Sequence, residues 1–503
     1  KILKFQFRRN KHLFDSTFNK LKSFFKTTKS KFEIFTELNL NLLLIEVIEH
    51  GTDFQDDTTP DEDYLIFKAY LLSIQRYLDI QLVKLKEETH HEGYIFNNLS
   101  WPMLVDQFKY TENNFELFHL IRSIVLIDEL NKSKYAKYLE NFNIKLKSKA
   151  QDYITNLLGI LEHKQILEVK GEKTPSFFVR LDEEIEFLNQ LSIDVNTEIH
   201  EELKIDQLVI RKKPLFKVDN LNFLILSRRF LKNKIYTGFI FDFYHISGIK
   251  DEIKSFPDFK TYLGKTINEE RVFQPLLETI FSVNGNKLFF IEKDGYPDCY
   301  LRILNRIFLI EFKDYLFGAK PLRSNKYIDF KNEIDNKFIR NEEGNPKGIS
   351  QLANQIKYLN TSTYDYDNFI EDKIERKKIE IYPLIVYTDY MYSIPGINSY
   401  LNLKFEEIKP ESDFKEIFQP IMIDLKFFLN NLARIQTTRF DNILKKYKYE
   451  IIKHQKKLAK NPTPQNWMNA NHSISHIDMG STFSRSNRKD LEEKLLNALK
   501  IDF

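Results

Sequence analysis

The stretch GYPDCYLRILNRIFLIEFKDY, residues 295–315, decides which fold is expected for this chain. It contains two runs rich in β-branched, aromatic and leucine side chains, Cys299–Ile303 and Ile307–Lys313. The three residues between these runs, Leu304–Arg306, suit a tight turn. The pattern therefore predicts a β-hairpin, with Asp298 directly before its first strand.

Three charged side chains are expected to converge on this hairpin. Side chains alternate along a strand, so Glu311 and Lys313 share one face. Ile310 and Phe312 then point to the other face and enter the core. Charges in so apolar a strand are costly to bury unless they are paired or bind a metal. Carboxylate oxygens from Asp298 and Glu311 suit Mg²⁺, which also accepts a phosphate oxygen.

The segments around the hairpin predict the order helix, strand, strand, helix, strand. Apolar spacing of three to four residues predicts the two helices, in NEERVFQPLLETIF and ISQLANQIKYLN. The run IEIYPLIVYTDY predicts the last strand. Helices interleaved with a small group of strands indicate an α/β layer architecture.

The pair Pro297-Asp298, followed by a strand, a turn and Glu311-Phe312-Lys313, resembles the motif of the PD-(D/E)XK nuclease superfamily. The resemblance covers about residues 260–400 and implies an α/β nuclease core with a mixed central sheet flanked by helices. It also implies metal-dependent cleavage of phosphodiester bonds with Mg²⁺ or Mn²⁺. Asp298 and Glu311 would bind the metal, and Lys313 would stabilise charge in the transition state.

Members of that superfamily commonly place a further acid on the helix before these strands. The helix offers Glu269, Glu270 and Glu278, and Glu270 is our choice for a catalytic and metal-binding residue. It precedes Phe273 and Leu277 by three and seven residues, which places it at the end of the buried stripe. A solvated acid at a helix start is the alternative.

The helix after the hairpin is similar to one that carries a glutamine toward the active site in many family members. Gln351 and Gln355 are four residues apart and share one face, where their amides could orient water or bind phosphate. An ordinary exposed face is the alternative. Tyr358 follows Gln355 at a spacing one residue shorter than the family's, so its stacking or packing role stays open.

The apolar patterns divide the chain into four expected segments. Residues 1–205 are predicted to form a mainly helical N-terminal domain, and residues 206–258 a strand-rich connecting region. Residues 259–405 form the expected nuclease domain. Residues 406–503 are predicted to form a helical C-terminal extension, with a polar loop at 461–487.

A basic stretch near the C-terminus is the candidate for binding nucleic acid. Net charge is only +3, so such a surface needs local clusters of cations. Lys446, Lys453 and Lys457 recur at seven- and four-residue spacing, so on a helix they project from one face and can track the phosphates of DNA. The alternative is a solvated face in a lysine-rich chain.

The composition excludes several classes of protein. The chain has 503 residues, of which 42% are hydrophobic, and this is typical of a folded globular protein with several domains. A single cysteine excludes an intramolecular disulfide and fits the cytoplasm. No apolar run reaches the roughly 18–20 residues that cross a bilayer. The sequence has no Walker loop or dinucleotide-binding fingerprint, so ATP-driven and redox chemistry lack support.

Two other candidate sites are weaker. His472, His476 and Asp478 have a spacing that could suit zinc, but no fourth ligand is in view. Cys299 alternates away from Asp298 on its strand, so it is expected to be a packed small residue and not a nucleophile.

The sequence therefore predicts a metal-dependent endonuclease that cleaves DNA. Family habit adds a role as the effector of a bacterial defence or restriction-like system, which includes antiviral defence. The alternative is an inactive nuclease fold that binds nucleic acid or scaffolds a complex. A second protein subunit and homo-oligomerisation are both open as partners, and no membrane is expected.

Overall fold

The computed structural model describes residues 37–50, 68–73, 75, 100, 116–162, 166–169, 172–175, 178–179, 185–194, 207–220, 222–282, 285–324, 326–474 and 493. The chain divides into two compact units, of which the first draws on Lys1–Glu88 and Leu146–Lys234. The second draws on Thr89–Lys145 and Ile235–Phe503. Because these units alternate along the chain, they differ from the four consecutive segments expected from the sequence.

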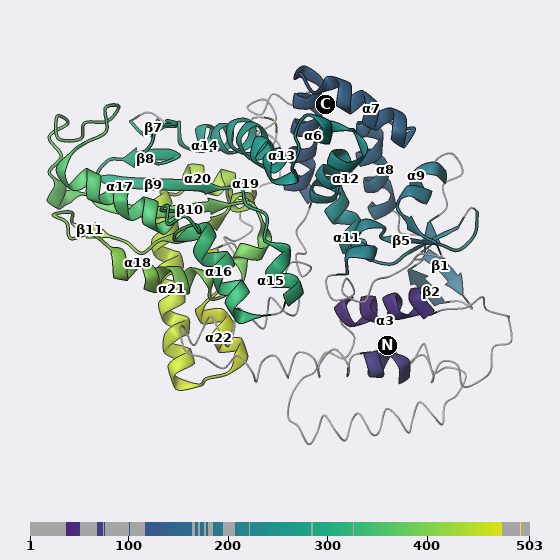
Figure 1. The fold of residues 1–503 in the computed structure, drawn as a ribbon. Coiled ribbons are helices and arrows are strands. Elements are labelled where there is room, and N and C mark those ends of the chain that lie inside the picture. The colour runs from purple at the N-terminus through teal and green to yellow at the C-terminus, as the bar shows by residue number, and fades with distance from the viewer. Residues whose placement is uncertain are drawn as a thin grey trace. The chain divides into compact units, whose positions relative to one another are not determined.

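The first unit combines helices with short strands (Figure 1). Its described helices are α3 (Glu37–His50), α8 (Ala150–Glu162), α9 (Ile185–Gln190), α10 (Leu208–Lys212) and α11 (Arg228–Asn233). Its described strands are β1 (Ile166–Val169), β2 (Glu172–Pro175), β3 (Phe178–Val179), β4 (Ser192–Ile193), β5 (Leu215–Lys217) and β6 (Phe223–Ile225). β1 and β2 form an antiparallel pair, and the other four strands form a sheet in the order β3-β6-β5-β4.

The second unit contains a mixed sheet. Its strands are β7 (Lys287–Phe289), β8 (Cys299–Ile303), β9 (Arg306–Lys313), β10 (Glu380–Tyr387), β11 (Glu416–Ile417) and β12 (Ile421–Asp424). The sheet order is β11-β10-β9-β8-β7, and β12 also pairs with β10. β7, β8 and β9 are antiparallel to one another in turn, whereas β10 runs parallel to β9, β11 and β12. The predicted α/β class with a mixed sheet is therefore confirmed.

Helices flank this sheet (Figure 1). The described helices of this unit that precede β7 in the chain are α6 (Glu116–Lys132), α7 (Ala136–Leu146), η4 (Lys234–Gly238), α12 (Phe239–Ile246), η5 (Ile249–Asp251), α13 (Phe256–Leu263), η6 (Gly264–Phe273) and α14 (Gln274–Phe281). Those that follow β9 are α15 (Ala319–Ser324), α16 (Tyr327–Phe338), α17 (Ile349–Thr361), η7 (Arg376–Lys378), η8 (Tyr390–Ser393), α18 (Ile397–Ile408), α19 (Leu425–Asn430), α20 (Leu432–Thr437), α21 (Phe440–Lys460) and α22 (Pro464–Ala470). The helical character expected of the N-terminal region and of the C-terminal extension is present in the described residues.

The predicted hairpin is confirmed, with a turn one residue shorter than expected. Ile303 pairs with Arg306, so Leu304 and Asn305 alone make the turn. Leu304 has a positive φ of 56°. A leucine rarely adopts this conformation. Glycine or asparagine usually marks such a position in a two-residue turn, and because Leu304 is neither, the sequence did not reveal the shorter turn.

Both faces of β9 are covered by side chains, so the strand lies inside the core. Every residue from Ile307 to Lys313 is buried. The ring of Phe312 stacks on Phe273 of η6, with ring centroids 4.5 Å apart. The ring of Phe308 lies 5.3 Å from that of Phe440, the first residue of α21. The charged residues of β9 are therefore enclosed by protein and not by solvent.

Among the described residues, no helix has both the length and the apolar character needed to span a bilayer. This agrees with the sequence, in which apolar runs are short and interrupted by charges.

A group of cations surrounds Glu380 at the start of β10. Its carboxylate accepts hydrogen bonds from Lys415 Nζ at 2.7 Å, Lys445 Nζ at 3.1 Å and the Tyr382 hydroxyl at 3.0 Å. Arg306 Nε of β9 lies 3.6 Å away. Burial opposes the charged form, but these hydrogen bonds outweigh it and lower the pKa of Glu380 to about 2. The cluster thereby ties β9, β10 and α21 together.

Replacing Glu380 with glutamine is expected to remove a stabilisation that depends on pH. The folded-state pKa is depressed, so the carboxylate stabilises the protein above its ordinary pKa of roughly 4.3, and this is lost as pH falls toward 2. We expect Glu380→Gln to lower the free energy of unfolding by about 1.5–3 kcal/mol at pH 7, and by clearly less at pH 3. Urea denaturation at both pH values measures this.

The control for that experiment is Glu407→Gln. Glu407 pairs with Lys404 at 3.0 Å, but its side chain is 59% exposed. Its replacement should change the free energy of unfolding by less than about 0.5 kcal/mol at either pH. An equal loss at pH 7 and pH 3 in Glu380→Gln would show that packing, and not charge, is responsible.

Candidate active site

The structure brings Asp298, Glu311 and Lys313 together. Lys313 Nζ donates to Glu311 Oε2 at 2.6 Å and lies 3.5 Å from Asp298 Oδ2. Asp298 precedes β8, and its Oδ2 accepts the backbone N–H of Phe312 at 2.7 Å. The hairpin thus fixes the first carboxylate directly against the strand that carries the second.

Burial and charge set the protonation of this group. Burial raises the pKa of Glu311 to about 7, the charge of Asp298 adds to the rise, and Lys313 opposes it. Burial disfavours the charged form of Lys313, but the two carboxylates outweigh it and raise its pKa. The ammonium group therefore keeps its proton and remains a fixed positive charge between two acids.

Of the two predicted glutamines, Gln355 reaches the carboxylates. Gln355 Nε2 donates to Glu311 Oε1 at 2.5 Å, and the residue is buried. Its Oε1 atom has no hydrogen-bond partner among the described residues. Gln355 therefore orients Glu311 and leaves one buried acceptor within the site.

Gln351 has a different place. Its Oε1 accepts the backbone N–H of Gly348 at 2.9 Å, which caps the start of α17. Gly348 has a φ of 41°, and a Cβ there would lie 2.8 Å from the carbonyl oxygen of Phe338. Gln351 thus stabilises the start of the helix that presents Gln355, and within the described part of the chain it makes no hydrogen bond to Asp298 or Glu311.

Glu269 and Glu270 differ in burial. Glu270 is exposed, whereas Glu269 is half-buried. Burial raises the pKa of Glu269 to about 7, and the charge of Asp298 raises it further. Glu269 is therefore a second candidate for the additional acid, and the role of Glu270 stays a prediction.

The backbone explains this difference of one position. The prediction assumed an α-helix, but Gly264–Phe273 forms a π-helix, whose hydrogen bonds join residues five apart. Its wider turn changes which residues share a face with Phe273. Pro275 at the start of α14 is the one sequence signal of the change, since it lacks the N–H that would continue the ladder.

A buried polar network lies beneath the site and was missed by the sequence analysis. The carboxylate of Asp314 accepts a hydrogen bond from Asn268 Nδ2 at 2.7 Å, and further bonds from Lys260 Nζ and Thr388 Oγ1. Arg122 Nε of α6 donates to Asn268 Oδ1 at 2.7 Å. No spacing in the sequence links these positions, because they lie on separate elements.

This network holds the two sides of the site together. Asp314 follows Lys313 in the chain, and Asn268 precedes Glu269. The hydrogen bond from Asn268 to Asp314 fixes the π-helix against the end of β9. The network therefore sets where the Glu269 carboxylate lies relative to Asp298 and Lys313.

The three lysines predicted to bind nucleic acid lie on α21, and this helix begins far from the carboxylates. Lys446, Lys453 and Lys457 are all exposed, and Lys453 pairs with Glu450 at 3.0 Å. Asp441, near the start of α21, lies 2.9 Å from Arg306 Nε at the start of β9.

Glu311 follows Arg306 by five residues on that strand, a distance of roughly 16 Å. Figure 1 shows α21 running away from the sheet. The anchored end of α21 is therefore at the other end of β9 from the carboxylates.

The weaker candidates have ordinary surroundings. Cys299 is fully buried, as expected for a packed residue, and burial raises the pKa of its thiol. The ring of His472 lies 5.9 Å from that of Tyr447, within a half-buried contact. His476 and Asp478 lie outside the described residues, so the zinc hypothesis rests on sequence alone.

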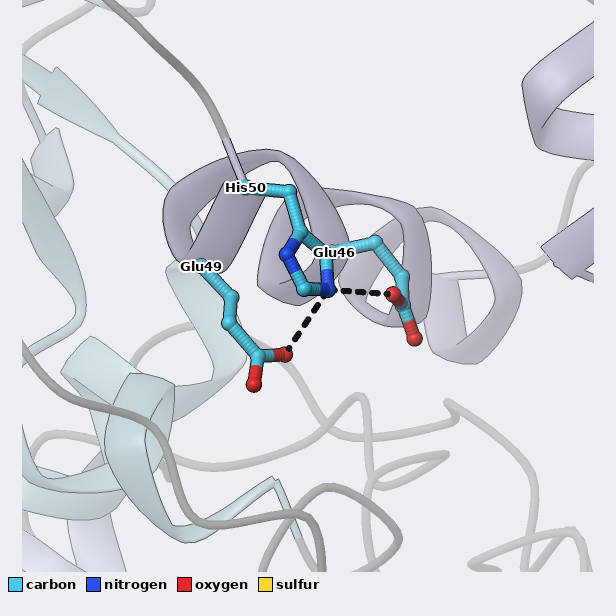
Figure 2. Close-up of side chains that lie close together, drawn as sticks. All are labelled: Glu46, Glu49 and His50. Atoms are coloured by element: carbon cyan, nitrogen blue, oxygen red, sulfur yellow. Dashed lines mark ion pairs between the residues drawn. The ribbon is translucent and has the colours of Figure 1, made fainter.

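Among the described residues, the one group of at least three histidine and carboxylate side chains whose ligand atoms all lie within 4.8 Å of one another is on α3 of the first unit. Figure 2 shows His50 beside Glu46 and Glu49, with Nε2 at 3.6 and 3.5 Å from their carboxylate oxygens. The His50 side chain is 66% exposed. Glu46 and His50 are one helical turn apart, a spacing at which exposed side chains readily form such a contact, and Glu49 directly precedes His50 in the chain.

Comparisons of the chain with protein-family models, curated proteins and solved structures found no match. The functional argument therefore depends on the geometry of the site and on the sequence motif.

Asp314→Ala is expected to destabilise the fold strongly, because it leaves the buried cations Arg122 and Lys260 without their shared carboxylate. We expect a loss of about 3–5 kcal/mol in the free energy of unfolding, measured by urea denaturation. Glu292→Ala is the control, since Glu292 pairs with Lys265 in an exposed contact whose removal should leave the free energy of unfolding nearly unchanged. Equally small losses of unfolding free energy in Asp314→Ala and Glu292→Ala would show that the network does not stabilise the fold.

Proposed function

We propose that this protein is a metal-dependent nuclease of the PD-(D/E)XK type that hydrolyses phosphodiester bonds in DNA. The observation that supports the proposal most is the meeting of Asp298 and Glu311 at Lys313, on a strand that is otherwise apolar and buried. A buried carboxylate beside a second one is costly to maintain, and such arrangements concentrate at functional sites.

The acids of the site fit a divalent cation. Asp298 and Glu311 offer the hard oxygen ligands that Mg²⁺ and Mn²⁺ prefer, and Glu269 offers a third carboxylate. The pKa values of Glu311 and Glu269 are both raised, first by burial and then by neighbouring acids, so both carboxylates would gain from a cation. When bound, the cation would supply Lewis-acid stabilisation of the phosphodiester and activate water.

The remaining side chains have distinct proposed roles. Lys313 keeps its proton and stabilises the negative charge that develops on the phosphate oxygens during attack. Gln355 Nε2 fixes the orientation of Glu311.

Affinity for the nucleic acid needs more cations than this site provides. Lys446, Lys453 and Lys457 of α21 remain our candidates for contacts with backbone phosphates, at a distance from the cleavage point. Family habit supports a role in bacterial, antiviral defence or a restriction-like system. A second protein subunit and self-association stay within the proposal, as does action in the cytoplasm.

Asp298→Ala and Glu311→Ala are each expected to abolish metal-dependent cleavage, because each removes a proposed metal ligand. Lys313→Ala should lower the rate by at least about 10²-fold, as expected for one positioned electrostatic stabiliser. Its metal affinity, measured by calorimetry, should stay closer to that of the unaltered protein. The assay uses plasmid, linear and single-stranded DNA, and RNA, with Mg²⁺, Mn²⁺ or a chelator.

Retained cleavage in Asp298→Ala or Glu311→Ala would refute the site. Binding of nucleic acid without cleavage by the unaltered protein would favour the alternative, an inactive nuclease fold that binds or scaffolds. Thermal unfolding of each variant separates loss of chemistry from loss of fold.

Glu269→Gln and Glu270→Gln form a matched pair of adjacent substitutions. We expect Glu269→Gln to lower the cleavage rate at least about tenfold and to weaken metal binding, because it removes a carboxylate charge beside Asp298. Glu270→Gln should stay within about twofold of the unaltered rate, since its side chain is exposed. A larger loss of cleavage rate in Glu270→Gln than in Glu269→Gln would assign the additional acid to Glu270.

A further inference from the structure

A column of tyrosine rings stands beside the carboxylates. The rings of Tyr358 and Tyr364 have centroids 5.2 Å apart and planes inclined by 23°. Those of Tyr364 and Tyr366 are 5.3 Å apart and inclined by 18°. Tyr364 is buried in the middle of the column, whereas Tyr358 is its outermost member and is 38% exposed. The column therefore ends in an aromatic ring that solvent reaches.

Hydrogen bonds hold this column in place. The Tyr358 hydroxyl donates to the carbonyl oxygen of Thr363 at 3.2 Å. Asp367, on the loop that carries Tyr364 and Tyr366, accepts two bonds from Arg302 of β8, at 2.5 and 2.6 Å. All the atoms of the Arg302–Asp367 pair are largely buried, so the loop is fixed to the sheet.

The helix α17 sets the exposed ring close to Glu311. Tyr358 follows Gln355 by three residues, so the two side chains are neighbours on one side of α17. Gln355 in turn contacts Glu311. The end of the column is therefore about one helical turn from the carboxylates.

The middle of the column is linked to the site by a second route. Tyr296 precedes Asp298 by two residues, and its ring lies 4.6 Å from that of Tyr364. The Tyr364 hydroxyl is buried and has no hydrogen-bond partner among the described residues. Burial and then the charge of Glu311 raise its pKa, which agrees with a position close to that carboxylate.

We propose that Tyr358 is a platform on which an unpaired nucleobase of the DNA strand stacks while the adjoining phosphodiester lies at Asp298, Glu311 and Lys313. The inference rests on the proposed nuclease function and narrows its substrate. A planar base would extend the column of near-parallel rings by one member, and its phosphate would meet the Lys313 ammonium.

The proposal implies a preference for single-stranded DNA or for frayed and flipped nucleotides. Bases inside a duplex already stack on both neighbours, so their faces are unavailable to a protein ring without unstacking. Stacking on an aromatic ring tolerates every base, because each has a π-face. Tyr358 would therefore select unpaired nucleotides of any sequence.

The test uses two substitutions of the same residue in the full chain. Tyr358→Phe keeps a planar ring, and Tyr358→Leu keeps an apolar side chain without one. The probe is a short single-stranded oligodeoxynucleotide that contains 2-aminopurine, whose fluorescence falls on stacking, in the presence of a chelator so that no cleavage occurs. Affinity is measured by fluorescence anisotropy of a labelled copy.

We expect the unaltered protein and Tyr358→Phe to quench 2-aminopurine fluorescence on binding. Tyr358→Leu should lose the quenching and bind at least about fivefold more weakly. A fully paired duplex that carries the same probe should show no additional quenching. Thermal unfolding of both variants checks that neither substitution has altered the fold.

Equal quenching by Tyr358→Leu and Tyr358→Phe would overturn the platform, as would binding without quenching by the unaltered protein. Failure to bind single-stranded DNA would overturn it too. Cleavage with Mg²⁺ is measured separately on the same preparations. Cleavage without quenching refutes the platform alone, whereas quenched binding without cleavage refutes the nuclease activity and leaves the platform in place.

Discussion

The contact between the Lys313 ammonium and the buried carboxylate of Glu311 is the constraint on which the site depends. Neither charge could remain in the interior of the sheet alone, because its desolvation would exceed what a typical hydrogen bond returns. The hairpin brings Asp298 to the same ammonium, and α17 brings Gln355 to the other oxygen of Glu311. The surrounding elements are thus arranged around two charges on one strand.

The sequence predicted the parts of the site that follow a regular period. Alternation along β9 correctly assigned Glu311 and Lys313 to one face, because the strand pairs with β10 without a bulge through Lys313. Apolar spacing located α17 and its glutamines, but it could not show that Gln351 caps the helix while Gln355 reaches inward. The π-helix breaks the assumed period, so apolar spacing could not show that Glu269 is half-buried there and Glu270 exposed.

The remaining features depend on contacts between residues far apart in the chain. Arg122 and Asp314 meet in one network, and Arg302 and Asp367 lock a loop, although no local pattern connects either pair. The two compact units likewise alternate along the sequence, whereas composition suggested consecutive segments. Such pairings are set by tertiary packing, which a local sequence pattern does not encode.

The parallel pairing of β9 with β10 has a consequence for the order in which the chain folds. The β8–β9 hairpin closes over a two-residue turn, whereas Arg306 meets Glu380 only after the intervening helices have formed a crossover. Loop-closure entropy makes the distant pairing the slower event. Asp298 and Glu311 therefore come together early, and Glu311 loses its water only when α17 and β10 dock. The burial of the charged centre is thus a late step of folding, and its kinetics report on the completion of the sheet.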